Sequence, residues 1–429
     1  MLLDQNLEFT FVANRAAKPK AVEGDFAHQL STFKGFGKTT VRLETIATTS
    51  GGGQISVPTY VNEFWTAKQR AASSLHEVSY RACFKPQLPR FFVDHLTQPG
   101  ETVYDPFTGR GTTLIEAALL GRVPYGCDIN PLSAVFTWPR LRLPALDEVV
   151  RRLSEIDYSG ETDNTDDLLA FYHPHTLKEI CGLKNYLVKR KDSGCSDLID
   201  DWIRMVAVNR LTGHSPGFFS VYTMPPNQAV SAKRQRLINE KRGQKPPRRN
   251  VREIICRKTR QLLSDCDPNV RSVLAATAPK ARLLTQHSAS TPEIPSGTVS
   301  LVVTSPPFLN VVDYAGDNWL RCWFVGIDAK AVKLTVPRKL DEWRIAMTAV
   351  LRELYRVLKP GGHVAFEVGE VHGGKTKLEE TVLPAGLEAG LEPVLVLIND
   401  QRFTKTANCW GVDNNARGTN TNRIVVFRK

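Results

Sequence analysis

Seven short stretches of the chain have the apolar, β-branched pattern of buried β-strands. They lie at residues 100–105, 123–128, 281–288, 298–303, 363–368, 393–398 and 423–427. Apolar runs of about four to eight residues are typical of strands covered by helices on both faces. A longer segment, 342–362, has apolar residues at helical spacing and ends at a glycine pair. This order predicts an α/β fold with a doubly wound, mostly parallel sheet of seven strands, the last two forming an antiparallel pair.

The middle of the chain interrupts the strand pattern. Helical spacing returns around 177–188 and 197–211, and the stretch 212–227 is rich in glycine, proline and aromatic residues. Residues 1–55 show no clear pattern. We therefore predict four parts, which are an N-terminal extension at 1–55, a first part of the sheet domain at 56–145, an inserted domain at 146–280 and a second part of the sheet domain at 281–429.

The net charge of the 429-residue chain is +12, and most of this excess lies in one segment. Residues 231–260 contain twelve Lys and Arg but only two Glu, a net charge of +10. A segment this basic favours a polyanionic partner, most simply the phosphate backbone of a nucleic acid. The residues that we expect to contact it are Lys233, Arg234, Arg236, Lys241, Arg242, Lys245, Arg248 and Arg249. The alternative is a solvated helix face, because blocks of like charge often contact only water.

The eight cysteines are scattered along the chain, and none of them forms a C-x-x-C pair. Neither a metal site nor a disulfide framework is therefore predicted, which fits a reducing cytosol. No apolar run approaches the roughly 18 residues of a membrane span, and the first residues lack the basic and apolar regions of a signal peptide. We expect a cytoplasmic protein without membrane contact.

The stretch T-S-P-P-F at 304–308 directly follows the predicted strand 298–303. Its two prolines fix the backbone and remove two N–H donors, so the loop is rigid and presents only acceptors. The Ser305 hydroxyl and the neighbouring carbonyls can accept hydrogen bonds from an amino group, and the ring of Phe308 can stack on a base. These features favour an enzyme that acts on the amino group of an extruded nucleobase. A plain proline-rich turn is the alternative.

A second motif, D-P-F-T-G-R-G-T-T at 105–113, joins a predicted strand to a helix. Gly109 and Gly111 make a tight turn that lets the backbone approach a ligand. Asp105 ends its strand, and Asp128 ends the next strand along the chain. An acid at this second position can accept both ribose hydroxyls of a nucleoside cofactor. The two acids around the glycine turn therefore predict a site for such a cofactor.

Together, the motifs at 105–113 and 304–308 resemble those of the DNA amino-methyltransferases, which use S-adenosylmethionine. In that family the first motif binds the cofactor and the second holds the target base. The serine form of the second motif is associated with methylation of cytosine N4, whereas the D/N-P-P-Y form goes more often with adenine N6. The order of the motifs, with the insert 146–280 between them, most resembles the alpha arrangement of these enzymes.

The resemblance implies roles for individual residues. The cofactor would contact Phe84, Pro86, Asp105, Phe107, Gly109, Gly111, Thr112, Thr113, Asp128, Ile129 and Thr304. The catalytic residues around the target base would be Ser305, Pro306, Pro307 and Phe308. In the family an acid often follows the third strand and reaches the adenine of the cofactor, but this chain has Ser288 and Ser290 there.

The resemblance implies a site-specific methyltransferase that acts on the N4 amino group of a flipped-out cytosine in double-stranded DNA. The insert would be the target-recognition domain, a cognate restriction endonuclease is a candidate partner, and the chain would act as a monomer or homodimer in the prokaryotic cytosol or nucleoid. Three alternatives stay open, which are methylation of adenine N6, methylation of RNA, and nucleic-acid binding without catalysis. Asp105, Asp128 and Ser305 argue against the last of these, because binding alone would not need them.

Overall fold

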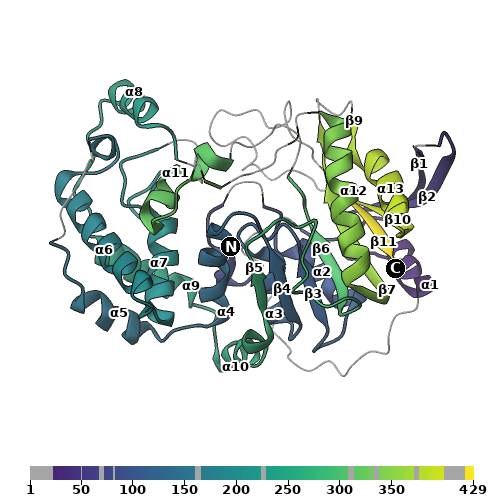
Figure 1. Ribbon diagram of the computed structural model, residues 1–429, viewed down its shortest axis with the longest axis horizontal. Helices are drawn as coiled ribbons and strands as arrows, with labels where there is room; N and C mark the ends of the chain where they lie inside the picture. The colour runs from purple at the N-terminus through teal and green to yellow at the C-terminus, as the bar shows by residue number, and fades with distance from the viewer. Residues whose placement is uncertain are drawn as a thin grey trace, which may run out of the picture.

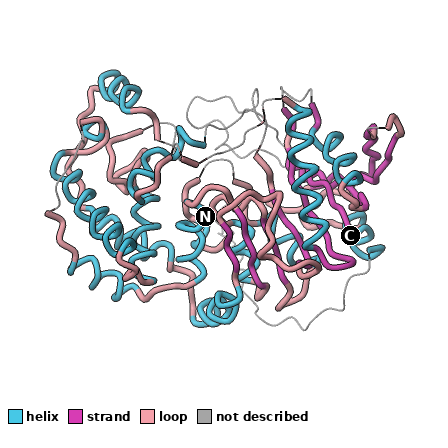
Figure 2. Tube along the Cα trace, in the orientation of Figure 1, coloured by secondary structure: helices cyan, strands magenta, loops and turns pink. Residues whose placement is uncertain are grey.

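The computed structural model describes residues 23–49, 51–66, 72–80, 83–159, 166–223, 229–307, 314–329, 331–332, 337, 339–371, 376–400 and 421–429. Within them, a part made of helices lies beside a part built on a sheet (Figure 1). The helical part is at the left of the view and the strands are at the right, as the colours of Figure 2 make plain. The predicted base-stacking residue Phe308 lies outside the described residues.

The sheet part is organised around nine strands among the described residues, in the order β1-β2-β10-β11-β7-β6-β3-β4-β5. Their bounds are β1 Val41–Thr48, β2 Gln54–Asn62, β3 Thr102–Asp105, β4 Val123–Cys127, β5 Arg282–Leu284, β6 Val299–Thr304, β7 Leu358–Val368, β10 Glu392–Asp400 and β11 Thr421–Arg428. The pairs from β7 through β6, β3 and β4 to β5 are parallel, whereas β11 runs antiparallel to both β7 and β10. A separate antiparallel pair consists of β8 Glu370–Val371 and β9 Thr376–Lys377. The predicted fold class is therefore confirmed.

The hairpin of β1 and β2 extends the sheet beyond the seven strands that the sequence predicts. β2 pairs in parallel with β10, and β1 lies outside β2 as an edge strand. The residues of β1, which we expected in an N-terminal extension, therefore belong to the sheet. The pattern does not reveal this strand, because Val41, Leu43 and Ile46 are all more than half exposed and mark no buried face. The division into four domains otherwise stays a prediction.

Helices cover both faces of the sheet, as a doubly wound fold requires. Their bounds are α1 Glu23–Ser31, α2 Gln87–Leu96, α3 Thr112–Leu119, α12 Leu340–Val357 and α13 Leu378–Glu388. The first three pack on the face that carries Leu301 and Val303 of β6. The last two pack on the opposite face, which carries Val302. Consecutive residues of β6 are thus buried on opposite sides, which explains why this strand is apolar throughout.

The helical part has its own core and includes more of the chain than the predicted insert. Its elements are η2 Ser74–His76, α4 Leu132–Leu141, α5 Leu146–Glu155, η3 Leu168–Ala170, α6 Pro174–Asp192, α7 Leu198–Arg210, α8 Ala232–Arg242, α9 Val251–Leu262, α10 Pro268–Thr277, η4 Ala278–Lys280 and α11 Tyr314–Val325. Leu320 and Phe324 of α11 are buried in one cluster with Trp202 of α7. The helix that follows the T-S-P-P-F loop is therefore anchored in the helical part. Among the described residues, no helix is both long and apolar enough to cross a membrane.

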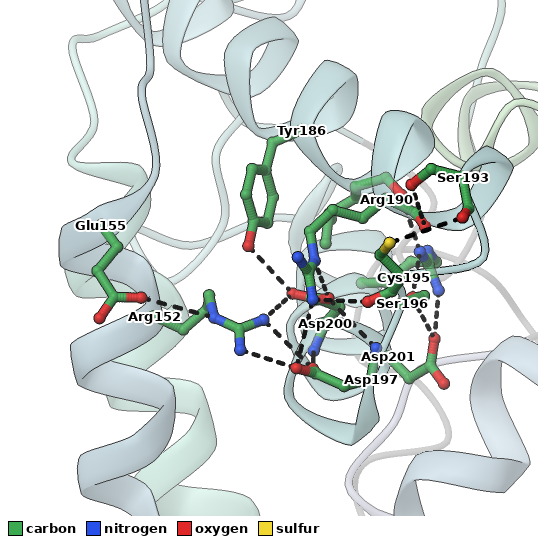
Figure 3. A network of polar contacts seen from close by, with 12 residues as sticks. Arg152, Glu155, Tyr186, Arg190, Ser193, Cys195, Ser196, Asp197, Asp200 and Asp201 are labelled. Atoms are coloured by element: carbon green, nitrogen blue, oxygen red, sulfur yellow. Dashed lines mark hydrogen bonds and ion pairs between the residues drawn. The ribbon is translucent and has the colours of Figure 1, made fainter.

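A network of charges ties three of these helices together (Figure 3). Asp200, in the first turn of α7, is fully buried, and both Arg152 of α5 and Arg190 of α6 bind its carboxylate. Asp197, the N-cap of α7, binds the same two arginines. A buried carboxylate is strongly destabilising without such partners. The network therefore fixes how α5, α6 and α7 meet.

Candidate active site

A cavity lies at the carboxyl ends of β3, β4 and β6, and α12 forms one of its walls. Doubly wound folds bind their ligands at this end of the strands. Nine of the predicted site residues line the cavity, namely Phe84, Asp105, Phe107, Gly109, Thr112, Asp128, Ile129, Ser305 and Pro307. The fold therefore brings the motifs at 105–113 and 304–308 into one site, although the whole insert separates them in the chain.

The turn of the first motif approaches the cavity because two glycines adopt backbone angles that other residues rarely adopt. The φ angle is +53° at Gly109 and +79° at Gly111. A Cβ atom added to Gly111 would lie 2.3 Å from Thr137 Oγ1, so α4 packs directly against the turn. The N–H of Gly109 donates to Asp128 Oδ2 at 2.7 Å. The turn is thereby fixed both to α4 and to the end of β4.

Asp128 lies half-buried just after β4. Its carboxylate accepts the N–H groups of Gly109 and Asn130, at 2.7 and 2.8 Å. Burial raises the pKa of Asp128, and the hydrogen bonds from Asn130 and Gly109 lower it. A carboxylate offers roughly four lone-pair sites, so acceptor capacity remains on the cavity side. This arrangement fits the expected contact with two ribose hydroxyls.

Asp105 is almost completely buried, yet it contributes to the cavity wall. Its Oδ1 accepts the Thr304 hydroxyl at 2.6 Å and the N–H of Phe107 at 3.0 Å. Burial raises the pKa of Asp105 to about 6, while the hydrogen bond from Thr304 lowers it. The carboxylate is therefore mostly ionised only above a pH of about 6.

Five predicted site residues lie behind the cavity wall, namely Pro86, Gly111, Thr113, Thr304 and Pro306. Thr304 is completely buried, and its hydroxyl is used by Asp105. Thr113 Oγ1 donates to the Val303 carbonyl at 3.1 Å, which ties α3 to the end of β6. Pro86 is the N-cap residue of α2. Their predicted roles toward a cofactor or a base stay predictions.

The T-S-P-P-F loop is held from two sides. The fully buried Trp343 of α12 donates its indole N–H to the Pro307 carbonyl at 2.9 Å. Thr304 pairs with Phe366 in the parallel register of β6 and β7, so the next residue, Ser305, lies beside Glu367. Burial raises the pKa of Glu367 to about 7. Interaction with the Ser305 side chain lowers the pKa of the Glu367 carboxylate.

Sequence reasoning did not find three residues that shape this site. Trp343 and Glu367 belong to a predicted helix and a predicted strand, and the apolar pattern of these segments assigns them to the core without indicating a role in a site. Arg110 occupies the variable position of the glycine turn, where it is buried and donates to the carbonyls of His76 and Val78. A glutamate inside the apolar strand 363–368 was the only signal available, because neither a core tryptophan nor a loop arginine is unusual.

The basic segment starts beside the helix that follows the active-site loop. The N–H of Ala229 donates to the Asp317 carbonyl at 3.3 Å, and Trp319 Nε1 donates to the Val230 carbonyl at 3.3 Å. Both contacts join the residues just before α8 to α11. In Figure 1, α8 lies at the outer end of the helical part, and α11 lies between it and the sheet.

The predicted DNA-contacting side chains are on the surface. Seven of the eight are exposed, and Arg249 is half-buried. Three of the exposed residues already have partners, because Arg236 pairs with Asp167, Arg248 is hydrogen-bonded to His175, and Arg242 lies over the ring of Tyr222. The segment therefore offers a cationic surface that is connected through α11 to the active-site loop.

Comparisons with known proteins agree with this architecture. Residues 44–133 match the model of the DNA methylase family N6_N4_Mtase. The chain is 23% identical to the type II methyltransferase M.BsoBI of Geobacillus stearothermophilus over 331 residues, which cover 68% of this chain and 60% of that protein. It is 37% identical to the type II methyltransferase M.MvaI of Kocuria varians over 129 residues, which cover 29% of this chain and 25% of that protein. The matched part therefore spans less than two thirds of either relative.

Among solved structures, the geranyl diphosphate C-methyltransferase of Streptomyces coelicolor A3(2) matches 80% of this chain and 77% of its own, with 10% identity and a TM-score of 0.33. At this TM-score, the strand order of the chain itself is the stronger basis for the fold. The sheet and the cavity at the carboxyl ends of its parallel strands define a doubly wound α/β protein with a ligand site at that end, and the matched family model supports S-adenosylmethionine as its cofactor. Within this class, residues 44–133 are similar to the DNA methylase family N6_N4_Mtase, and this match together with the similarity to M.BsoBI supports the resemblance that the motifs indicate.

The lining of the cavity fits S-adenosylmethionine, the cofactor that the motifs predict. Asp128 presents a carboxylate with spare lone pairs at the end of β4, where a ribose would lie. Ile129 and Phe107 supply apolar wall on either side of it. The ionised Asp105 suits a ligand that carries positive charge. His287 and Ser288 occupy the wall after β5.

Proposed function

We propose that this protein is a site-specific DNA methyltransferase that methylates the exocyclic N4 amino group of a flipped-out cytosine. The observation that carries the proposal is the position of Ser305. Its hydroxyl lies at the wall of the same cavity that contains Asp105 and Asp128. A base that enters from the loop side would therefore meet its acceptor next to the cofactor site.

The proposed reaction requires the protein to activate the exocyclic amino group, which is a poor nucleophile. The lone pair of an exocyclic amino group is delocalised into the ring, and acceptors that bind its two hydrogens restore part of it to nitrogen. Ser305 Oγ and a proline carbonyl are such acceptors, and Trp343 keeps the loop in place through the Pro307 carbonyl. When bound, S-adenosylmethionine supplies the methyl group on a positively charged sulfur. Holding the two reactants at the correct distance accounts for much of the rate enhancement.

The proposed substrate is double-stranded DNA, and the basic segment 231–260 is its proposed contact surface. Its charge of +10 supports binding to phosphates. Because the residues just before α8 contact α11, DNA bound to the segment would lie near the active-site loop. Because two relatives are named type II methyltransferases, the proposal includes a role beside a restriction endonuclease.

Mass spectrometry of total nucleosides tests the reaction directly. DNA is incubated with the protein and S-adenosylmethionine, and Ser305→Ala is treated in parallel. We expect N4-methylcytosine that is absent from the Ser305→Ala reaction. Detection of N6-methyladenine would keep the fold and the acceptor chemistry but would refute the choice of base. Absence of any methylated base from DNA, with intact cofactor binding, would refute DNA as the substrate and lead to RNA.

A binding assay tests the DNA surface. Removing one phosphate contact lowers the slope of log K against log salt concentration by about one. We expect such a change, with a few-fold weaker binding to all sequences, for both Arg234→Ala and Lys241→Ala. Arg42→Ala is the matched control, because this exposed arginine lies on the edge strand β1 at the far end of the sheet. Equal salt slopes in all variants would remove the segment from the interface.

A further inference from the structure

Glu367 is a buried carboxylate that the proposed reaction does not yet use. It stands near the end of β7, among apolar residues from Val364 to Val368, and only 6% of its surface is exposed. It lies outside the cavity, with Ser305 between them. Asn422 of β11 donates to its carboxylate, and Ser305, the residue after β6, lies beside it in the register of β6 and β7. The carboxylate is therefore connected to the cavity through one hydroxyl group.

No salt bridge compensates the burial of Glu367 among the described residues. Three ionisable groups of the surrounding elements bind other partners. Asp105 of β3 binds Thr304, Arg423 of β11 binds Glu379, and Arg90 of α2 binds Glu116. The remaining ionisable groups on this side are Lys85, Asp94 and His95, in or just before α2. Burial therefore dominates and raises the pKa of Glu367 to about 7, while the hydrogen bond from Asn422 and the interaction with Ser305 lower it. A group with this pKa can exchange a proton near neutral pH.

We propose that Glu367 is the positioning residue that accepts the proton of the Ser305 hydroxyl during methyl transfer. This inference rests on the proposed function. In its ionised form, Glu367 accepts the hydroxyl proton and turns the lone pairs of Ser305 Oγ toward the amino group of the base. In its protonated form, Glu367 accepts the Ser305 hydroxyl only weakly, so the Ser305 oxygen becomes a weaker acceptor for the amino group.

The proton balance of the step is complete with groups that the site contains. The amino nitrogen forms a bond to the methyl carbon, and the electron pair of the carbon–sulfur bond stays on sulfur. The nitrogen then has one hydrogen too many. That proton passes to Ser305 Oγ, while the proton of Ser305 passes to the Glu367 carboxylate. Water restores the ionised carboxylate after the product leaves.

The pH dependence of kcat is the first test. We expect kcat of the unmodified protein to fall about tenfold per pH unit below the pKa of Glu367, because the protonated carboxylate cannot accept. The Gln side chain of Glu367→Gln cannot titrate, so this variant should have a lower kcat and should lack the acidic limb, which is the fall of kcat below the pKa. Its affinity for S-adenosylmethionine should be unchanged. In Asn422→Ala, one hydrogen bond to the ionised form is lost, so the limb should move upward by about one pH unit.

Glu353→Gln is the matched control, because Glu353 is also a buried glutamate with hydrogen bonds, to Thr291 and Arg356, but is not part of the cavity wall. This variant should keep the limb of the unmodified protein. A Glu367→Gln variant that binds cofactor and retains the original limb would overturn the proposal.

A second readout needs no catalysis. A glutamate whose pKa is raised on folding favours the folded state when protonated, so its contribution to stability is present below the pKa of the unfolded chain and is lost as pH rises through about 7. We therefore expect the Tm of the cofactor-free protein, minus that of Glu367→Gln, to fall between pH 5 and pH 8. In a Ser305→Ala background this fall should shift to higher pH.

The coupling between the two residues would be refuted by a Tm difference that does not change with pH. It would also be refuted if the pH midpoint of this change were the same with and without the Ser305→Ala substitution. If no DNA is methylated at all, the Tm series still decides whether Ser305 and Glu367 share a proton. The failure of this inference and the failure of the proposed function are thereby separated.

Discussion

The cofactor half and the base half of the cavity use the same device at neighbouring strand ends. In the cofactor half, the buried Asp105 accepts the hydroxyl of Thr304. In the base half, the buried Glu367 lies beside Ser305, and we propose that it accepts the Ser305 hydroxyl. The two hydroxyl residues are adjacent in the chain, and each lies beside a carboxylate on a different strand, β3 or β7. Burial raises the pKa of both carboxylates, to about 6 and about 7.

The two halves differ in which partner faces the cavity. Asp105 itself lines the cavity and Thr304 stands behind it, whereas Ser305 lines the cavity and Glu367 stands behind it. A carboxylate at the wall suits a cofactor with positive charge. A hydroxyl at the wall can accept a hydrogen bond from a neutral amino group while it donates its own hydrogen to a carboxylate behind it. Under the proposed function, the same pair of groups would serve binding in one half and chemistry in the other.

The strongest test of this comparison is Ser305→Ala. The variant removes an acceptor at the reacting amino group, so we expect kcat to fall roughly 100- to 1000-fold, as for other single transition-state hydrogen bonds. The affinity for S-adenosylmethionine should stay within about twofold, because Ser305 belongs to the base half. Isothermal titration calorimetry and single-turnover methylation measure the two quantities. A comparable loss of cofactor affinity would show that the halves are not separate.

Asp128→Ala should have the opposite profile. It removes an acceptor that we assign to the ribose and releases the N–H of Gly109, so cofactor affinity should fall roughly 10- to 100-fold. At saturating cofactor, kcat should change little. Asp147→Ala, which removes an exposed acid on α5, is the control for general charge effects. If kcat fell more than affinity, Asp128 would have to be placed in the chemistry.

Thr304→Val should give the smallest effect and the most specific one. The change keeps the shape of the side chain but removes the hydrogen bond that lowers the pKa of Asp105. The pKa of Asp105 should therefore rise, and the charged form that favours the cofactor should be lost at a higher pH. We expect affinity to be up to about tenfold weaker near pH 6.5 and nearly unchanged at pH 8.5. Equal losses at both pH values would mean that the hydroxyl only supports packing.

The local pattern was sufficient to predict most of the sheet. The seven strands and the turn at 105–113 are encoded by neighbours in sequence, since apolar runs, β-branched residues and glycines act within a few positions. The same locality limits the prediction at β1, where an exposed edge strand carries no buried face. It also limits the assignment of individual roles, because Thr113 and Thr304 belong to the motifs but face the interior.

The sequence by itself determined the class of the protein, its cofactor and the two motifs that make the site. Each of these is written in short stretches whose chemistry is visible without neighbours. Only the tertiary structure decided which carboxylate stands behind Ser305 and which indole fixes Pro307. Glu367 and Trp343 reach the loop from β7 and α12, so their roles depend on strand register and helix packing. Contacts between residues on different strands do not appear in the hydrophobic periodicity of either segment, so they are determined only when the strands pair in register.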